Sequence, residues 1–354
     1  IFRAKDPKAE DVVGTKREKG TDSIHLNRRG EYLQACVWVA KLFGKDVRDI
    51  AYAPTGFGSA DEFALMRRAA AEAVRIGVKE PEAWQDNSRL SEGREKPRAA
   101  FAPFSSEEKA LKVLPEFSDR QVSLDSETAW KFNWAKDPDS RPQDFWKPDY
   151  DVSAWPSIRV PCSWQAYGAN GKGGWGRALY TNITYPFQKD VPGGSLVTIE
   201  PPETYSTYLE RNPVGSYRRD FELPDGWNRD RIYLKFDGVD SFFYLWVNGK
   251  YVGFSKDSRS PAEFDVTEVV RPGRNVVALE VYRYSDGSYL EDQDMFRLSG
   301  IFRRTWLVRR PASRIRDFFI TAKPVKDGDF AGDWEMNVEV DGDPEIALYT
   351  FADE

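Results

Sequence analysis

The segment 242–254 reads FFYLWVNGKYVGF and decides the fold. It consists of two aromatic and apolar runs separated by Asn248 and Gly249, and Asn-Gly is the dipeptide favoured in a tight β-hairpin. The preceding segment, 231–239, alternates apolar and polar residues, which is the period of a half-buried strand; its apolar members are Ile232, Leu234 and Phe236. The sequence therefore predicts antiparallel strands in this region.

Similar strand patterns occur on both sides of the hairpin. The strings SYRRDFEL (216–223), NVVALEVYRY (275–284) and RTWLVRRP (304–311) are spaced by Pro, Gly and Asp turns, without a strong helical segment between them. Many short strands at such spacing are typical of a β-sandwich. A further strand-like segment, 314–340, predicts the opening of another β domain. We therefore expect a mainly β fold.

The N-terminal part has helical patterns instead. In 30–43 the apolar positions follow helical spacing, and Gly44 stands where a left-handed C-cap is wanted; those positions are Leu33, Cys36, Val37 and Ala40. Ser59 and Glu62 form a capping-box pattern for a second helix. Its apolar stripe consists of Phe63, Met66, Ala70, Ala73 and Val74. We expect the two helices to pack together.

Composition and charge exclude several classes of protein. With 354 residues the chain is long enough for two or three domains. The net charge of -6 provides no basic field for nucleic acid, and no apolar run reaches the roughly 18 residues that span a bilayer. Only two cysteines, Cys36 and Cys162, and one histidine, His25, are present, so disulfide scaffolds and multi-histidine zinc sites are excluded.

The loop 285–303, SDGSYLEDQDMFRLSGIFR, is rich in carboxylates: Asp286, Glu291, Asp292 and Asp294 fall within nine residues. Such carboxylates repel one another unless they are protonated, paired with arginine or bound to a hard cation. Arg297 and Arg303 are near enough in sequence to pair with them. A solvated, arginine-paired loop and a binding site both remain open on spacing alone.

This loop resembles the sugar-binding domain of family 2 β-galactosidases almost residue for residue. Three more stretches match in the same order: VPCSWQAYG (160–168), YTNITYPF (180–187) and DGVDSFFYLWVNGKYVGFSKDSRSPAEFD (237–265). The resemblance implies a jelly-roll (galactose-binding-like) sandwich over 120–311. It also implies the start of an immunoglobulin-like β domain over 312–354. The segment 79–119, which precedes the sandwich, is charged, contains Pro and has no sustained period of 2 or 3.6, so we expect a linker or extended arm there.

The resemblance also implies site residues. Asn182 matches an amide that hydrogen-bonds a sugar hydroxyl, and Asp294 matches a carboxylate that touches both galactose and a sodium ion. Asp286 matches a magnesium ligand of some members, but Lys256 stands where those members can carry a Gln ligand, and an ammonium cannot ligate a cation. We therefore expect this magnesium site to be incomplete. Asn182 also lies in a glycosylation sequon, Asn-Ile-Thr, which is an alternative reading.

The activity implied is retaining hydrolysis of terminal non-reducing β-D-galactose residues by a homo-oligomeric parent enzyme. It needs two glutamates on a catalytic barrel. The acid/base glutamate normally follows an asparagine, and this sequence contains no Asn-Glu dipeptide. We therefore expect this chain to be an inactive, sugar-binding part of a longer protein. A non-catalytic carbohydrate-binding module is an alternative, which predicts measurable galactose affinity for the chain alone.

The segment DSIHLNRRGEYLQACVWVAKLFG (22–44) resembles the end of SGNH-type esterases, in which a terminal Asp-x-x-His supplies two members of a catalytic triad. The resemblance implies that 1–78 is a remnant of such a domain, with Asp22 and His25 as a remnant dyad. The alternative is a surface turn in which Asp22 caps a helix. An esterase fused to a β domain is a third possible function. No targeting segment is visible, so the sequence leaves the localisation open. A protein that removes both esters and galactose from polysaccharide would act in the periplasm or outside the cell rather than in the cytoplasm.

Overall fold

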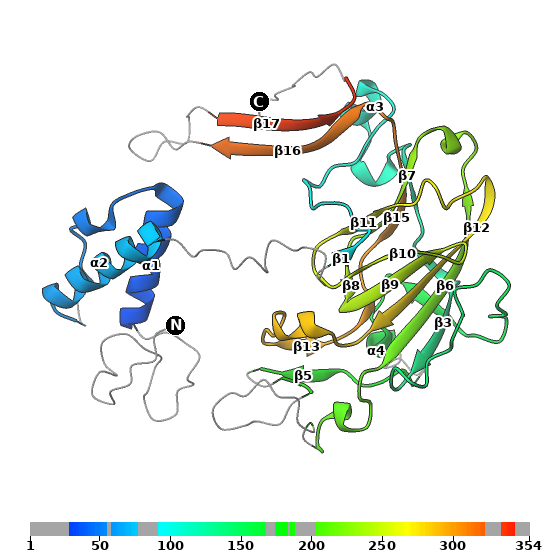
Figure 1. The fold of residues 1–354 in the computed structure, drawn as a ribbon, viewed down its shortest axis with the longest axis horizontal. Coiled ribbons are helices and arrows are strands. Elements are labelled where there is room, and N and C mark those ends of the chain that lie inside the picture. Colours follow the sequence, from blue (N-terminus) through cyan, green and yellow to red (C-terminus); the bar gives the residue numbers. More distant parts are fainter. Residues whose placement is uncertain are drawn as a thin grey trace. The chain divides into compact units, whose positions relative to one another are not determined.

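A computed structural model describes residues 28–54, 58–76, 91–167, 174–182, 185–187, 201, 203–322 and 334–343. The chain divides into two compact units, 1–86 and 87–354 (Figure 1). Asp22 and His25 lie outside the described residues, as does most of the proposed esterase remnant that precedes the helices.

The first unit is a helical pair. Helix α1 (Arg28–Phe43) and helix α2 (Ala60–Ile76) flank a short 3-10 helix, η1 (Val47–Asp49). The predicted capping box is confirmed, because Ser59 N–H donates to Glu62 Oε2 at 2.6 Å and Glu62 N–H donates to Ser59 Oγ at 3.2 Å. Gly44 has the expected left-handed φ of 60°.

The two helices share an apolar core, as predicted. Its buried residues are Tyr32, Cys36, Ala40, Val47, Phe63, Met66 and Ala70, with Leu33, Val37 and Val74 packed against them. The prediction was wrong for Ala73, which is exposed. The stripe therefore ends on Ala70 and Val74, which are four residues apart and so share a helix face.

The second unit contains the predicted jelly-roll β-sandwich. Its larger sheet is antiparallel with strand order β1-β10-β9-β12-β6-β3-β4. These strands are β1 (Ser91–Glu92), β3 (Ser126–Ala135), β4 (Ser157–Val160), β6 (Val214–Leu223), β9 (Phe242–Val247), β10 (Lys250–Ser255) and β12 (Gly273–Tyr282). Figure 1 shows the strands of this sheet fanning across the unit.

The second sheet has the order β11-β7-β15-β2 and is also antiparallel. Its strands are β2 (Gln121–Ser123), β7 (Arg231–Phe236), β11 (Ala262–Asp265) and β15 (Thr305–Arg310). Two short ribbons complete the sandwich: β5 (Leu179–Thr181) pairs with β13 (Met295–Arg297), and β8 (Val239–Asp240) pairs with β14 (Gly300–Ile301). A one-turn helix, α4 (Trp164–Tyr167), follows β4.

The hairpin at 242–254 forms as predicted. Lys250 pairs with Val247 across the turn, and Asn248 and Gly249 have φ values of 51° and 79°. Positive φ at both central residues lets the turn follow the right-handed twist of its strands, which explains why Asn-Gly stands there. The other predicted strands are confirmed as β6, β12 and β15.

A single apolar core lies between the two sheets. It contains Trp130, Phe132 and Tyr217 from the larger sheet and Ile232, Leu234 and Phe236 from β7, among others. The expectation of a half-buried strand at β7 was incomplete, because Tyr233 is also fully buried. Its ring packs with Trp306 and Val308 on the outer face of the smaller sheet, and the guanidinium of Arg310 lies over it.

The described part of the arm, 91–119, lies against the sandwich. Strand β1 adds to the edge strand β10, and Arg94 forms a bridge with Phe264. Arg98 donates to both oxygens of Glu263, at 3.0 and 3.2 Å. Helix α3 (Glu107–Lys112) and the 3-10 turn η4 (Pro115–Phe117) then lead into β2.

Beyond Pro311 the chain forms an antiparallel pair, β16 (Arg314–Ala322) and β17 (Trp334–Asp341). Strands were predicted here, and whether they open an immunoglobulin-like domain stays a prediction. Among the described residues, no helix has the length and apolar character needed to cross a membrane.

Candidate functional site

The ribbon made by β5 and β13 brings the two predicted sugar-binding residues together. Met295 pairs with Thr181, and Phe296 pairs with Tyr180. Extending this register by one residue places Asp294 opposite Asn182. The motif YTN and the motif EDQD, which are more than 110 residues apart in the sequence, therefore meet at one end of the ribbon (Figure 1).

One face of this ribbon points outward. Side chains alternate between the faces of a strand, so Asp294 and Phe296 share a face with Asn182 and Tyr180. All four side chains are exposed. The Tyr180 hydroxyl donates to Asp294 Oδ1, and the rings of Tyr180 and Phe296 meet edge to face at 5.5 Å. The hydrogen bond from the hydroxyl to Asp294 raises the pKa of Tyr180. The outward face thus combines an amide, a carboxylate and two aromatic rings.

The opposite face of the ribbon is held by Arg297. Its Nε donates to Thr181 Oγ1 at 2.8 Å, and its Nη1 donates to the carbonyl of Glu291 at 3.1 Å. Its Nη2 donates to the carbonyl of Gln293 at 2.9 Å and to the carboxylate of Asp292. The side chain is only 7% exposed. One buried guanidinium therefore ties both motifs into one geometry.

Each carboxylate of the loop has its own partner. Asp292 pairs with Arg297, Glu291 accepts from Ser258, Asp286 pairs with Lys256 and Asp294 accepts from Tyr180; these contacts are all within the second unit. Arginine pairing was one of the two readings left open by the sequence, and it occurs at Arg297. Arg303 instead donates from its Nη1 to the carbonyl of Arg259 at 2.8 Å.

The contacts of Asp286 do not fit a magnesium ligand. Its Oδ2 lies 2.8 Å from the Lys256 ammonium, and its Oδ1 accepts from the Gly287 N–H at 3.0 Å. Across the described ranges, no cluster of three or more His, Cys, Asp or Glu side chains could hold a metal ion. Magnesium prefers six oxygen ligands, so the residues present here do not build this site.

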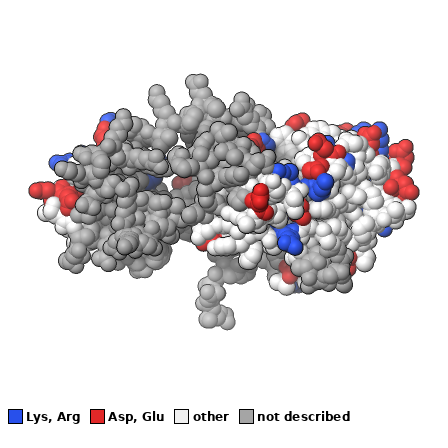
Figure 2. Space-filling view, turned by 90° about the horizontal axis from the view of Figure 1, so that it is seen from below, with Lys and Arg blue, Asp and Glu red and all other residues white. Residues whose placement is uncertain are grey.

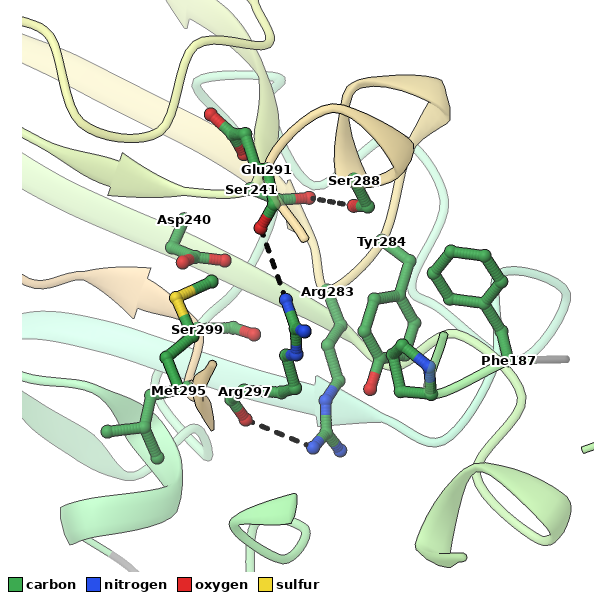
Figure 3. A pocket seen from close by; sticks show the side chains of 12 residues that line it. Phe187, Asp240, Ser241, Arg283, Tyr284, Ser288, Glu291, Met295, Arg297 and Ser299 are labelled. Carbon is green, nitrogen blue, oxygen red and sulfur yellow. Dashed lines mark hydrogen bonds between the residues drawn. The ribbon is translucent and has the colours of Figure 1, made fainter. Parts of the chain in front are cut away.

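A small cavity lies beneath the carboxylate loop (Figure 3). It is lined by residues from three segments of the chain, including Phe187, Asp240, Arg283, Tyr284 and Arg297. Its volume is about 20 Å³, roughly the room of one water molecule. A pyranose ring does not fit a cavity of this size. We take the exposed ribbon face, which carries both predicted residues, as the candidate sugar site.

Charged side chains are buried around this cavity. Arg283 is fully buried and donates to the carbonyls of Arg177 and Arg297, at 2.9 and 3.1 Å. Asp240 pairs with Arg259 at 3.0 Å. Burial raises the pKa of Asp240 to about 7; Glu291 acts in the same direction, and the nearby arginines oppose it. Ionised Asp240 is therefore costly here despite its partner.

The described surface of the second unit carries both signs of charge. Figure 2 shows blue and red side chains interspersed over the part of this face that is described. The carboxylate loop is also not uniformly acidic, since each of its acidic side chains has a basic or hydroxyl neighbour.

A family model described as "Glycosyl hydrolases family 2, sugar binding domain" matches residues 123–311, more than half of the chain. This chain belongs to that family. The matched residues include the whole β5–β13 ribbon and the carboxylate loop.

Relatives of this family 2 chain are named β-galactosidases. The protein from Priestia megaterium is 38% identical over 259 residues, covering 73% of this chain and 23% of the relative. The large subunit from Leuconostoc lactis is 37% identical, covering 64% and 35%, and the protein from Vibrio cholerae is 43% identical, covering 54% and 17%. This chain thus spans between 17% and 35% of the length of these three relatives.

Solved structures of lower similarity include β-glucuronidases. One from an uncultured Clostridium species is 20% identical with a TM-score of 0.45, covering 65% of this chain and 35% of that one. Another, from Bacteroides uniformis, is 20% identical with a TM-score of 0.40, covering 57% and 20%.

Some residues of the candidate site were not predicted from the sequence. Tyr180 and Phe296 lie inside the matching motifs, but their exposure and cross-strand contact depend on the pairing of β5 with β13. The period-2 pattern was the available signal: Tyr180 and Asn182, like Asp294 and Phe296, are two residues apart and so share a strand face. Asn182 and Asp294 are brought together as the resemblance implied, whereas their roles toward sugar and sodium stay predictions.

Proposed function

We propose that this chain is the sugar-binding part of a retaining β-galactosidase, which releases terminal non-reducing β-D-galactose. The observation that carries the proposal is the outward face of the β5–β13 ribbon, where Asn182, Asp294, Tyr180 and Phe296 stand together. The names of the Priestia, Leuconostoc and Vibrio relatives support the same substrate.

Each group on this face suits a different part of a sugar. An amide such as Asn182 both donates and accepts hydrogen bonds, while the carboxylate of Asp294 accepts from hydroxyls. Aromatic rings such as Phe296 can pack against the apolar C–H face of a pyranose. Binding at this face would orient galactose and leave the buried hydrogen bonds of Arg297 intact, because they lie on the opposite side of the ribbon.

Sodium is the cofactor that the proposal includes. Asp294 offers a hard carboxylate oxygen, and its exposure leaves an oxygen free to face an ion. When bound, sodium would supply a positive charge that attracts sugar hydroxyl oxygens. One carboxylate is too few for a complete coordination shell, so in this proposal the remaining ligands come from the longer protein.

The catalytic carboxylates belong, in this proposal, to the longer protein as well. Retaining hydrolysis needs an acid/base and a nucleophile about 5 Å apart. The partly buried acids of the loop are already engaged, since Asp292 pairs with Arg297 and Glu291 accepts two hydrogen bonds from Ser258. These engagements support a binding role for the loop and not an acid/base role.

The test uses the full-length protein from the same reading frame, with nitrophenyl β-galactoside and β-glucuronide as substrates. We expect hydrolysis of the galactoside, a higher KM in the Asn182→Ala and Asp294→Asn variants, and loss of sodium dependence in the latter. Asp220→Asn, in an exposed pair with Arg274, is the control and should leave KM unchanged.

Two outcomes would contradict the proposal: preference for the glucuronide, or unchanged galactoside KM in both site variants. Calorimetric titration of the 354-residue chain with galactose distinguishes this proposal from the alternative, a non-catalytic carbohydrate-binding module. Tight binding by the chain alone, together with no hydrolysis by the full-length protein, would favour that module. We expect weak binding by the chain, because the proposed site is completed outside it.

A further inference from the structure

Lys256 stands where the resemblance implied a Gln ligand of a metal ion, and it contacts Asp286, the other implied ligand. Its Nζ lies 2.8 Å from Asp286 Oδ2. A lysine ammonium only donates hydrogen bonds and cannot share a carboxylate with a cation at that distance without strong repulsion. The ammonium thus engages one oxygen of the Asp286 carboxylate, and the Gly287 N–H donates to the other.

The Lys256 side chain is held in this position by its surroundings. It is 17% exposed, whereas Asp286 is 72% exposed. Its Nζ also lies over the ring of Phe254 at 5.8 Å. The Gly287 backbone lies against that of Lys256, since a Cβ built at Gly287 would be 3.4 Å from the Lys256 carbonyl oxygen. The lysine is therefore an ordered part of the loop's base.

The residues that follow Lys256 also contact acidic side chains. Ser258 donates from its N–H and its hydroxyl to Glu291, at 2.8 and 2.6 Å. Arg259 pairs with Asp240 at 3.0 Å. The segment 256–259 thus connects the end of β10 to both ends of the 286–291 turn, and Lys256 supplies the connection to its first residue.

We propose that the Lys256 ammonium is a built-in substitute for a divalent cation, holding the 286–291 turn beneath the sugar-binding ribbon without metal. A charge carried on the chain cannot dissociate, so the order of the turn is independent of free magnesium. The negative charge of the Asp286 carboxylate must be balanced whether a metal ion or a lysine lies beside it. The single positive charge of the Lys256 ammonium balances it.

Hydrogen exchange measured by mass spectrometry on the 354-residue chain tests this inference. In the wild type, exchange at 285–291 should be the same with millimolar magnesium and with EDTA. Lys256→Met should speed that exchange about fivefold, the value expected for losing a partly exposed ion pair, and Lys256→Arg should restore protection. Lys112→Met, in the exposed pair with Glu108, is the matched control and should leave 285–291 unchanged.

Faster exchange in wild type on adding EDTA would overturn the inference, and so would wild-type protection in Lys256→Met. If Lys256→Met does not fold, Asp286→Asn removes the same ion pair from its exposed side and should give the same increase. None of these measurements requires hydrolytic activity, so their outcome is separate from that of the proposed function.

Discussion

The Nε of Arg297 donates a hydrogen bond to Thr181 Oγ1 at 2.8 Å. This bond joins β5 and β13, which end next to Asn182 and Asp294, and it is buried on the face opposite to those two side chains. The same guanidinium holds the carbonyls of Glu291 and Gln293. The geometry of the exposed candidate site is therefore determined by a group that does not reach its surface.

Replacing Arg297 with lysine should loosen this site. Lysine retains the charge but has one point-like donor group in place of the planar fork, so several buried acceptors lose their partners. We expect the free energy of unfolding to fall by about 2 kcal/mol. Urea denaturation of the chain measures this loss. Arg274→Lys, in an exposed pair, should cost less than about 0.5 kcal/mol, and equal losses in the two variants would contradict the argument.

Glu263 should be the most sensitive acid in the sandwich. Its carboxylate is 8% exposed and lies between Arg98 of the arm and Arg310 of β15. Burial acts to raise its pKa, but the two guanidiniums outweigh burial and hold the pKa below the usual range. Glu263→Gln leaves two guanidiniums without their counter-charge and should cost about 3 kcal/mol. Thermal unfolding measures this cost. Asp220→Asn is the exposed control, and a loss no larger than that control would refute the expectation.

Asp240 should make stability depend on pH. Its folded pKa is about 7, above about 3.9 in an unfolded chain. Between these values the folded chain holds a proton that the unfolded chain has lost. Its contribution to the free energy of unfolding therefore falls as pH rises from about 4 to about 7, and it is constant above that range.

Asp240→Asn removes this titration, because asparagine has no proton to lose in this range. The unfolding free energy of the variant relative to wild type should thus rise by on the order of 2 kcal/mol between about pH 5 and about pH 8. Urea denaturation at the two pH values gives the difference directly. A difference that stays constant with pH would show that Asp240 is ionised throughout.

Gly93 should control the attachment of the arm. Its φ is 67°, and a Cβ there would lie 2.2 Å from the carbonyl oxygen of Val252 in β10. Gly93→Ala should therefore separate β1 from the sheet edge and expose Arg94 and Lys96 to trypsin. Limited proteolysis measures the rate of cleavage.

Gly226→Ala is the control for this variant, since Gly226 also has a positive φ, 77°, but open space around its Cβ position. It should strain the backbone by about 1 kcal/mol without speeding cleavage of the arm. If the two variants are cleaved at the same rate, backbone strain and not the contact with β10 would explain the result.

Much of the fold was predictable because its signals are local. The hairpin at Asn248 and the capping box at Ser59 each depend on residues within a few positions of one another, and both formed as predicted. The burial of Tyr233, in contrast, did not follow from a local signal. Its strand showed the alternation of a half-buried element, and only the packing of Trp306 beside it explains its burial.

The candidate site was predictable in part for the same reason. Asn182 and Asp294 were identified through motifs that are contiguous in sequence, whereas the role of Tyr180 required a contact across 114 positions. Arg303 shows the opposite error: its nearness in sequence to the carboxylates suggested pairing, but in the folded chain its Nη1 donates to the carbonyl of Arg259.

The sequence by itself determined the mainly β class, the turn at Asn248 and Gly249, and the four motifs through which the chain resembles the sugar-binding family. Periodicity and turn chemistry act over a few residues, so they can be read along the chain. Only the tertiary structure decided that β5 pairs with β13, that Arg297 lies beneath the site, and that Lys256 meets Asp286. These contacts join residues 30 or more positions apart, and packing of the whole sandwich is what brings them within hydrogen-bonding distance.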